Sequence, residues 1–278
     1  MTVTSHLPGT SHRTPVVLLH ALSLHSSMWE AQERALRALG HPVLAVDQRG
    51  FGEAPLGDSP PSLDVIADDL ARTLDGHGMG RVVLAGSSMG GYAAMAFLRR
   101  FPGRVAGLAL LSARATADDS VAAAQRIRFA ELVQDPAHRP VIVERVTPLL
   151  LADTTRADRP GLLARVLADA HAADPTALAW AQRAIAARPD STDVLRAAEI
   201  PALVIAGAQD TLVTPRESRH VADVLPQGRL ITLTRAGHLQ PLEAPEEVTH
   251  ALCGLLDEVD EVDEVEATAG IGSGARAC

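Results

Sequence analysis

Six short apolar runs recur along this chain, and they limit the folds that it can adopt. All are rich in Val, Leu, Ile and Ala. The runs are PVVLLH (15–20), PVLAVD (42–47), RVVLAG (81–86), VAGLALLS (105–112), PALVIAG (201–207) and RLITLT (229–234). Uniform hydrophobicity is typical of strands buried on both faces of a parallel sheet. Helical patterns lie between the runs, so the sequence predicts an α/β fold with a doubly wound, mostly parallel sheet.

The alternation of strand and helix lapses between Arg114 and about Leu195. This stretch contains several amphipathic helical patterns, separated by Asp-Pro, Arg-Pro and Thr-Pro breaks, and no strand-like run. We interpret residues 114–194 as a helical cap, inserted between two parts of one sheet domain at 14–113 and 195–258. Such a cap would cover the edge of the sheet where ligands bind in folds of this kind. A separate helical domain is the alternative.

The charged residues are unevenly distributed. The formal net charge is −9, but seven acidic residues lie between Asp257 and Glu266, and the remainder has 27 acidic against 25 basic residues. The body of the protein is therefore nearly neutral, which argues against a nucleic-acid partner. We expect residues 259–278 to form an acidic, disordered tail.

Several classes of protein are excluded by residues that the sequence lacks. All 25 basic residues are Arg, so neither a P-loop lysine nor a Schiff-base lysine is present. The two cysteines show no metal-ligand spacing, and we expect neither a metal nor a cofactor. No apolar stretch reaches the length of a membrane span, and the first fifteen residues lack the apolar segment of a signal peptide. We therefore expect a cytoplasmic protein without a membrane partner.

The stretch VLAGSSMGGYAAM contains two adjacent serines, of which only one fits a catalytic pattern. Gly86-Ser87-Ser88-Met89-Gly90 matches G-x-S-x-G with Ser88 at its centre. The motif lies after an apolar strand and before a helical pattern, where a sharp turn, the nucleophile elbow, presents its central hydroxyl at a helix N-terminus. Ser88 is the predicted nucleophile.

Two further residues follow in the order that this turn requires, which is nucleophile, acid, histidine. Asp210 follows the run PALVIAG, and His238 follows RLITLT. Because the carboxyl ends of parallel strands meet at one edge of a sheet, we expect both side chains to reach Ser88. The three residues predict a Ser-His-Asp catalytic triad.

These motifs resemble those of α/β-hydrolases, and the resemblance covers residues 15–256. The matching stretches are LLHALSLHSSMW, DQRGFGEAP, GSSMGGYAAM, PALVIAGAQDTLVTP and AGHLQPLEAPEEV. Within the family, the chain looks most like small bacterial esterases and lactonases related to 3-oxoadipate enol-lactonase.

The resemblance implies roles for residues around Ser88. By this match, the backbone N–H groups of Leu22 and Met89 form the oxyanion hole. The chain departs from the family at Ala21, where a glycine is usual, so a backbone conformation with positive φ is unfavourable there. We also expect Trp29 and Leu239 to line the substrate pocket.

Together these features predict a serine hydrolase that cleaves a carboxylic ester or lactone of a small molecule. Thioesterases, carbon–carbon bond hydrolases and cofactor-free haloperoxidases or perhydrolases use the same triad and remain alternatives. A hydrolase-like ligand sensor is an alternative of another class. The sequence carries no signal of the oligomeric state.

Overall fold

The six apolar runs form one parallel sheet in the computed structural model, which describes residues 13–273. The strands are β1 (Val16–Leu19), β2 (Val43–Val46), β3 (Val82–Ser87), β4 (Val105–Leu111), β5 (Ala202–Gly207) and β6 (Gly228–Leu233). Their order across the sheet is β2-β1-β3-β4-β5-β6, and every neighbouring pair is parallel. The predicted α/β fold class is thus confirmed.

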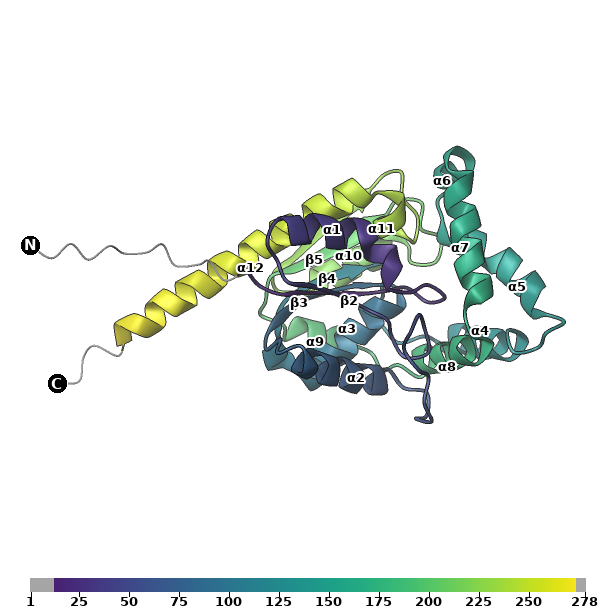
Figure 1. Cartoon of the computed structure of the whole chain (residues 1–278), viewed down its shortest axis with the longest axis horizontal. Coiled ribbons are helices and arrows are strands. Elements are labelled where there is room, and N and C mark those ends of the chain that lie inside the picture. Colours follow the sequence, from purple (N-terminus) through teal and green to yellow (C-terminus); the bar gives the residue numbers. More distant parts are fainter. Residues whose placement is uncertain (1–12, 274–278) are drawn as a thin grey trace, which may run out of the picture.

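Helices cover both faces of the sheet (Figure 1). One face is covered by α2 (Leu63–Gly76), α3 (Met89–Arg100), α9 (Thr192–Arg196) and α10 (Pro215–Val224), and the other by α1 (Glu30–Ala38) and α12 (Pro245–Ser273). Successive residues of β3 alternate between the two layers, so Leu84 packs in one apolar cluster and Val83 in the other. Burial on both faces explains the apolar sequences of the four inner strands, whereas the edge strands β2 and β6 are only partly buried.

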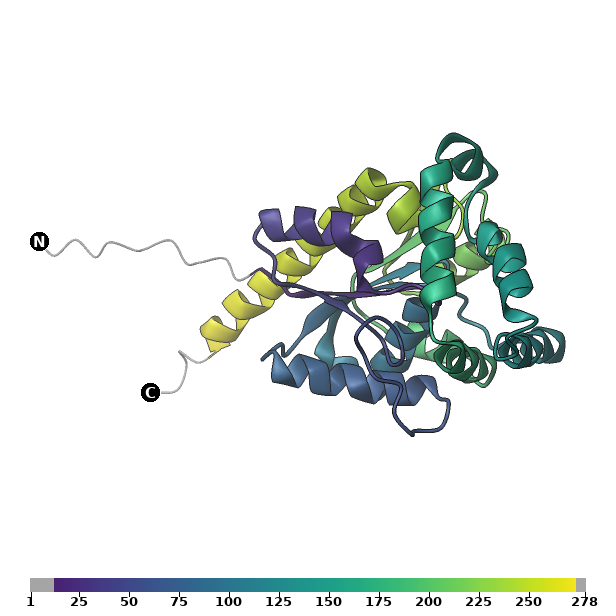
Figure 2. The ribbon, with the colours of Figure 1, turned by 45° about the vertical axis from the view of Figure 1, so that its right-hand side comes forward.

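Five further helices gather at one end of the sheet, and we call them the cap helices. They are α4 (Ser120–Leu132), α5 (Arg139–Val146), α6 (Asp153–Asp158), α7 (Pro160–Ala172) and α8 (Pro175–Ala186). They lie beyond the carboxyl ends of the strands in both views (Figures 1 and 2). Short 3-10 helices complete the chain at Ser26–Trp29, Pro102–Arg104 and Thr147–Leu150, with the short helix α11 at Gln240–Glu243. The domain limits at residues 114 and 194 stay a prediction.

The acidic segment differs from the expected disordered tail, because α12 continues through Ser273. Val259 is 1% exposed and packs in the core. Its neighbours pair with arginines that lie before or on the strands: Asp260 with Arg13 at 3.2 Å, Asp263 with Arg81 at 2.7 Å and Glu258 with Arg229 at 3.0 Å. The acidic segment is therefore a continuation of helix α12 along the protein, and its first part is not a free tail. Residues 274–278 lie outside the described residues.

In the part of the chain that the structure describes, no helix combines the length and the hydrophobicity that crossing a bilayer requires.

Asp260 anchors α12 to the start of the sheet, and its loss should destabilise the fold. Its carboxylate accepts hydrogen bonds from the backbone N–H of Thr14 at 3.0 Å and from the hydroxyl of Thr14 at 2.6 Å. We expect Asp260→Asn to lower the free energy of unfolding by about 1–3 kcal/mol in urea titrations. Glu261→Gln, at an exposed position on the same helix, is the matched control and should change stability by less than about 0.5 kcal/mol. Equal effects of the two substitutions would show that Asp260 is no anchor.

Candidate active site

Ser88 lies in a sharp turn between β3 and α3. Its φ of 52° is in the left-handed region that side chains other than glycine rarely adopt. The turn is possible because two backbones approach closely at the glycines. A Cβ added to Gly90 would lie 2.2 Å from the carbonyl oxygen of Leu19 in β1, and one added to Gly86 would lie 2.3 Å from the carbonyl oxygen of Gly90. The neighbouring Ser87 points into the core, fully buried.

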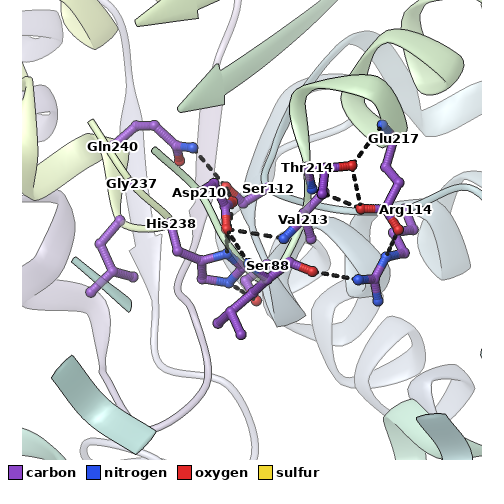
Figure 3. A network of polar contacts seen from close by, with 12 residues as sticks. Ser88, Ser112, Arg114, Asp210, Val213, Thr214, Glu217, Gly237, His238 and Gln240 are labelled. Carbon is purple, nitrogen blue, oxygen red and sulfur yellow. Dashed lines mark hydrogen bonds and ion pairs between the residues drawn. The ribbon is translucent and has the colours of Figure 1, made fainter. Parts of the chain in front are cut away.

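The structure brings Ser88, His238 and Asp210 into one hydrogen-bonded chain. His238 Nε2 lies 2.8 Å from Ser88 Oγ, and His238 Nδ1 lies 2.9 Å from Oδ2 of Asp210. Figure 3 shows the imidazole lying between the hydroxyl and the carboxylate. Asp210 and His238 follow β5 and β6, so the parallel sheet delivers both to the edge at which Ser88 stands.

The carboxylate of Asp210 is fixed from several sides. The hydroxyl of Ser112 donates to Oδ2 at 2.7 Å, and the backbone N–H groups of Leu212 and Val213 donate to Oδ1 at 2.8 and 3.0 Å. Burial acts to raise the pKa of Asp210, but the charge and hydrogen bond of His238 and the Ser112 hydrogen bond outweigh it and hold the pKa below its usual value. The carboxylate is therefore charged at neutral pH, and it orients the imidazole with its proton on Nδ1.

A buried glutamate, Glu243 of α11, holds the loop that carries the histidine. Its Oε1 accepts from the backbone N–H of Gly237 at 3.0 Å and of Leu239 at 3.1 Å, the residues on either side of the histidine. Its Oε2 accepts from the N–H of Ala152 and the hydroxyl of Thr155, both at 2.8 Å. One carboxylate thus ties the histidine loop to the segment where cap helix α6 begins.

Of the two backbone groups predicted for an oxyanion hole, one belongs to the residue that follows Ser88, and the other belongs to a residue that lines the same cavity as Ser88. Met89 is the first residue of α3, where N–H groups have no partner within the helix, and Leu22 lines the same cavity as Ser88. Neither N–H group has a hydrogen-bond partner among residues 13–273. The loop takes its positive φ at Ser23, with a value of 65°, and not at Ala21. The alanine that replaces the usual glycine is therefore compatible with the loop.

His20 is a structural residue in this arrangement. It is fully buried, its Nδ1 donates to the carbonyl of Ala21 at 2.8 Å, and its Nε2 accepts from the backbone N–H of Gln48 at 2.9 Å. Burial lowers the pKa of His20 to about 4. Both ring nitrogens are engaged and the ring is neutral at physiological pH, so His20 joins the first two loops of the sheet and is no candidate base.

A cavity of about 430 Å³ opens above Ser88 and His238, both of which line it. The cap helices supply much of its wall, including Phe129 of α4, Val146 of α5 and Leu178 of α8. A largely apolar cavity of this size suits a small organic molecule.

Two residues predicted to line the pocket do not reach this cavity, and those predictions were wrong. Trp29 and Leu239 are fully buried in the core cluster under α1 and α12. With few aromatic residues in the chain, Trp29 is needed to fill the core, and Leu239 packs in the same cluster.

Sequence reasoning also missed residues that support the site. Ser112 and Glu243 act through Asp210 and through backbone groups, and no motif marks such partners in a single sequence. Gln240 donates to the Ser112 hydroxyl at 2.6 Å and extends this network into the core. Gln240 and Glu243 closely follow the predicted catalytic histidine, and this position is the signal that would have suggested them, whereas Ser112 carries no such signal. Among the side chains described for residues 13–265, no three His, Cys, Asp or Glu are grouped in a way that would hold a metal ion.

Comparison with known proteins agrees with this fold. Residues 14–245 match the model of the alpha/beta hydrolase fold family. A pimeloyl-[acyl-carrier protein] methyl ester esterase of Neisseria meningitidis serogroup B is 30% identical over 236 residues, which are 80% of this chain and 85% of that protein.

Two solved structures are also similar to this chain. An esterase from Thermogutta terrifontis, with malate bound, has a TM-score of 0.84 and 37% identity, covering 89% of this chain and 90% of its own. The enol-lactonase from Burkholderia xenovorans LB400 has a TM-score of 0.80 and 26% identity, covering 88% and 92%.

The buried imidazole of His20 should make stability depend on pH. Because its folded pKa of about 4 is below the ordinary value of 6.5, the unfolded chain binds more protons between these values, and stability falls as the pH drops through this window. The shift corresponds to about 3 kcal/mol. We expect the difference in unfolding free energy between the wild type and His20→Gln to shrink by up to this amount between pH 6.5 and pH 4. A difference in unfolding free energy that stays constant between pH 6.5 and pH 4 would contradict the prediction.

Glu243 should control the reactivity of Ser88 through the histidine loop. In Glu243→Gln, one of the two carboxylate oxygens becomes an NH₂ group facing N–H or O–H donors, so either the loop or the cap segment loses its acceptor. We expect the rate at which a fluorophosphonate probe labels Ser88 to fall roughly 10- to 100-fold, as small displacements of reacting groups do. Glu246→Gln, at an exposed position nearby, is the control. A variant that melts at a lower temperature but is labelled at the wild-type rate would reduce Glu243 to a purely structural role.

Proposed function

Because the chain belongs to the alpha/beta hydrolase fold family, we propose that it is a serine hydrolase that cleaves a carboxylic ester or lactone of a small molecule. The observation that carries the proposal is the hydrogen-bonded chain from Ser88 Oγ through the imidazole of His238 to Asp210, with distances of 2.8 and 2.9 Å. The similar proteins with names that state an activity include esterases and an enol-lactonase, which supports the same class of reaction.

In the proposed reaction, the neutral imidazole of His238 accepts the hydroxyl proton of Ser88 as the oxygen attacks the ester carbonyl. The charged carboxylate of Asp210 stabilises the imidazolium that forms. The imidazolium then protonates the leaving alcohol, and an acyl-enzyme remains on Ser88. Water then attacks the acyl carbonyl as its proton passes to His238, and the imidazolium returns this proton to Ser88 Oγ as the acyl–oxygen bond breaks and the acid leaves.

Backbone groups would stabilise the negative charge that develops on the carbonyl oxygen. The N–H groups of Leu22 and Met89 have no competing partner in the described chain, and Met89 lies at the N-terminus of α3, where the helix dipole favours an anion. Each such donor contributes on the order of 10²- to 10³-fold to turnover in hydrolases. This role places no demand on side chains at either position.

Thioesters, carbon–carbon bonds and peracid formation are alternatives that the same three side chains can serve. They differ from esters in the leaving group and in the shape of the pocket, which the cap helices form. A small molecule as the substrate, and no nucleic acid or membrane, is part of the proposal. A panel of purified acyl esters, lactones, thioesters and diketones would rank these reactions, and a ligand sensor would show slow turnover on all of them.

Substitution of the two adjacent serines tests the proposal. Ser88→Ala removes the nucleophile, so we expect ester hydrolysis to fall on the order of 10³-fold or more and fluorophosphonate labelling to disappear. Ser87→Ala is the matched control. Its hydroxyl is buried without a hydrogen-bond partner in the described chain, so labelling should persist at position 88. Mass spectrometry of the labelled peptide identifies the serine, and a label on Ser87 or full activity of Ser88→Ala would overturn the assignment.

A further inference from the structure

Cap side chains place polar groups in the cavity wall that the proposed ester cleavage does not use. They are Gln125 and Arg126 of α4 and Gln182 of α8. Arg126 donates through Nε to Asp118 at 2.5 Å and through Nη1 to Oε1 of Gln182 at 3.1 Å. Within residues 13–265, Nη2 of Arg126 and Nε2 of Gln182 have no hydrogen-bond partner. These N–H donors are available to a ligand.

The charges around Arg126 do not cancel. The carboxylate of Asp118 also pairs with Arg188 at 2.8 Å, and the side chains of Asp118 and Arg188 are only 1% and 4% exposed. Burial acts to raise the pKa of Asp118, but the two guanidinium groups outweigh it and hold the pKa below its usual value. One carboxylate thus serves two guanidinium groups, and the cluster carries a net charge of +1. Arg126, with 23% of its side chain exposed, is the member that reaches the cavity.

No other group in the cavity wall, as the described residues form it, compensates for this charge. These lining residues include no Asp or Glu. The second arginine in the wall, Arg114, pairs with Glu217 at 2.6 Å, so that pair is neutral. An uncompensated positive charge in a partly enclosed, low-dielectric cavity attracts an anion strongly.

The cluster is joined to the nucleophile through Tyr92. This residue lies one turn after Ser88 in α3, and its N–H donates to the Ser88 carbonyl at 3.1 Å. The guanidinium of Arg188 stacks over the Tyr92 ring at 4.2 Å from its centroid, and Tyr92 itself lines the cavity. The positive cluster and the serine are therefore parts of one cavity.

We propose that Arg126 and Gln182, with Gln125 beside them, bind a free carboxylate carried by the substrate. This inference rests on the proposed function and names its substrate class: esters or lactones with a second, unesterified carboxylate, such as monoesters of dicarboxylic acids. A planar guanidinium with an available N–H group and a neighbouring amide N–H match the two oxygens of a carboxylate. The apolar remainder of the wall suits the methylene groups that join it to the ester.

Binding can be measured without turnover in the Ser88→Ala protein. Calorimetric titration compares the monomethyl esters of glutaric, adipic and pimelic acids with the corresponding dimethyl esters, which lack the charge. We expect at least one monoester to bind more tightly than its diester. Adding Arg126→Met should weaken monoester binding roughly 10- to 100-fold, as loss of a charge-assisted hydrogen bond does. Equal binding of monoesters and diesters in the Ser88→Ala protein would overturn the inference, whatever the enzyme hydrolyses.

The kinetic test uses the wild-type chain with 4-nitrophenyl monoesters of the same acids and their neutral methyl-capped analogues. A second series places the carboxylate on the alcohol, in acyl esters of 4-hydroxybenzoate and of its methyl ester. In Arg126→Met, the ratio of kcat/KM for charged over neutral substrate should fall roughly 10- to 100-fold in the series whose carboxylate reaches the cluster. The control Arg128→Met alters an exposed arginine of the same helix that pairs with Glu131, and its ratio should stay within about twofold of the wild type.

Arg126→Lys keeps the positive charge but not the planar fork, so it should retain part of the preference for charged over neutral substrates. This variant shows whether loss of charge or misfolding explains the behaviour of Arg126→Met. If every Arg126 variant hydrolyses neutral esters and the ratio of kcat/KM for charged over neutral substrate is unchanged, the carboxylate site is refuted. The proposed function would then still stand. If the wild type hydrolyses neither series, the proposed ester hydrolysis fails, and the binding experiment still decides the carboxylate site.

Discussion

The close contact between backbones at the turn of Ser88 is the constraint on which the rest of the site depends. Gly90 packs directly on the carbonyl oxygen of Leu19, so α3 begins in contact with β1 and Ser88 is forced to a positive φ. That backbone conformation costs free energy. The pairing of β3 with strands on both sides holds the turn in place and offsets this cost. The hydroxyl is thereby held at a helix N-terminus before any partner is added. A larger residue at either glycine would separate the helix from the sheet and relax the turn.

The partners of Ser88 are held less by the sheet than by buried polar contacts that surround their loops. Asp210 is fixed by Ser112 and by two backbone N–H groups, and the histidine loop is fixed by Glu243. Since Glu243 also binds the first turn of α6, the position of His238 depends on the packing of the cap. One carboxylate therefore holds the loop of His238 and the start of cap helix α6 together.

The sequence was sufficient to predict the features that local pattern and topology determine. It was insufficient for features that depend on contacts between residues distant in the sequence. The six apolar runs identify six strands, of which the four inner ones are fully buried. A parallel sheet must bring the residues after these strands to one edge, so Ser88, Asp210 and His238 could be selected. Trp29 and Leu239 were misplaced because hydrophobicity does not distinguish a core residue from a pocket residue. The helical acidic segment was missed because its partners, Arg13, Arg81 and Arg229, are distant in sequence. Glu243 binds backbone groups, which leave no trace in side-chain patterns.

The charged cluster beside the cavity is difficult to explain as a stabilising device. Burying Asp118 and Arg188 removes both from water, and buried ion pairs often contribute no more than apolar side chains of the same size. The third member, Arg126, adds a positive charge that no carboxylate among the described lining residues balances. A negatively charged ligand would neutralise the cluster. Its attraction to Arg126 would offset the free energy that removing these charged groups from water costs. The imbalance thus favours the proposed carboxylate site in the cap, at a distance from Ser88.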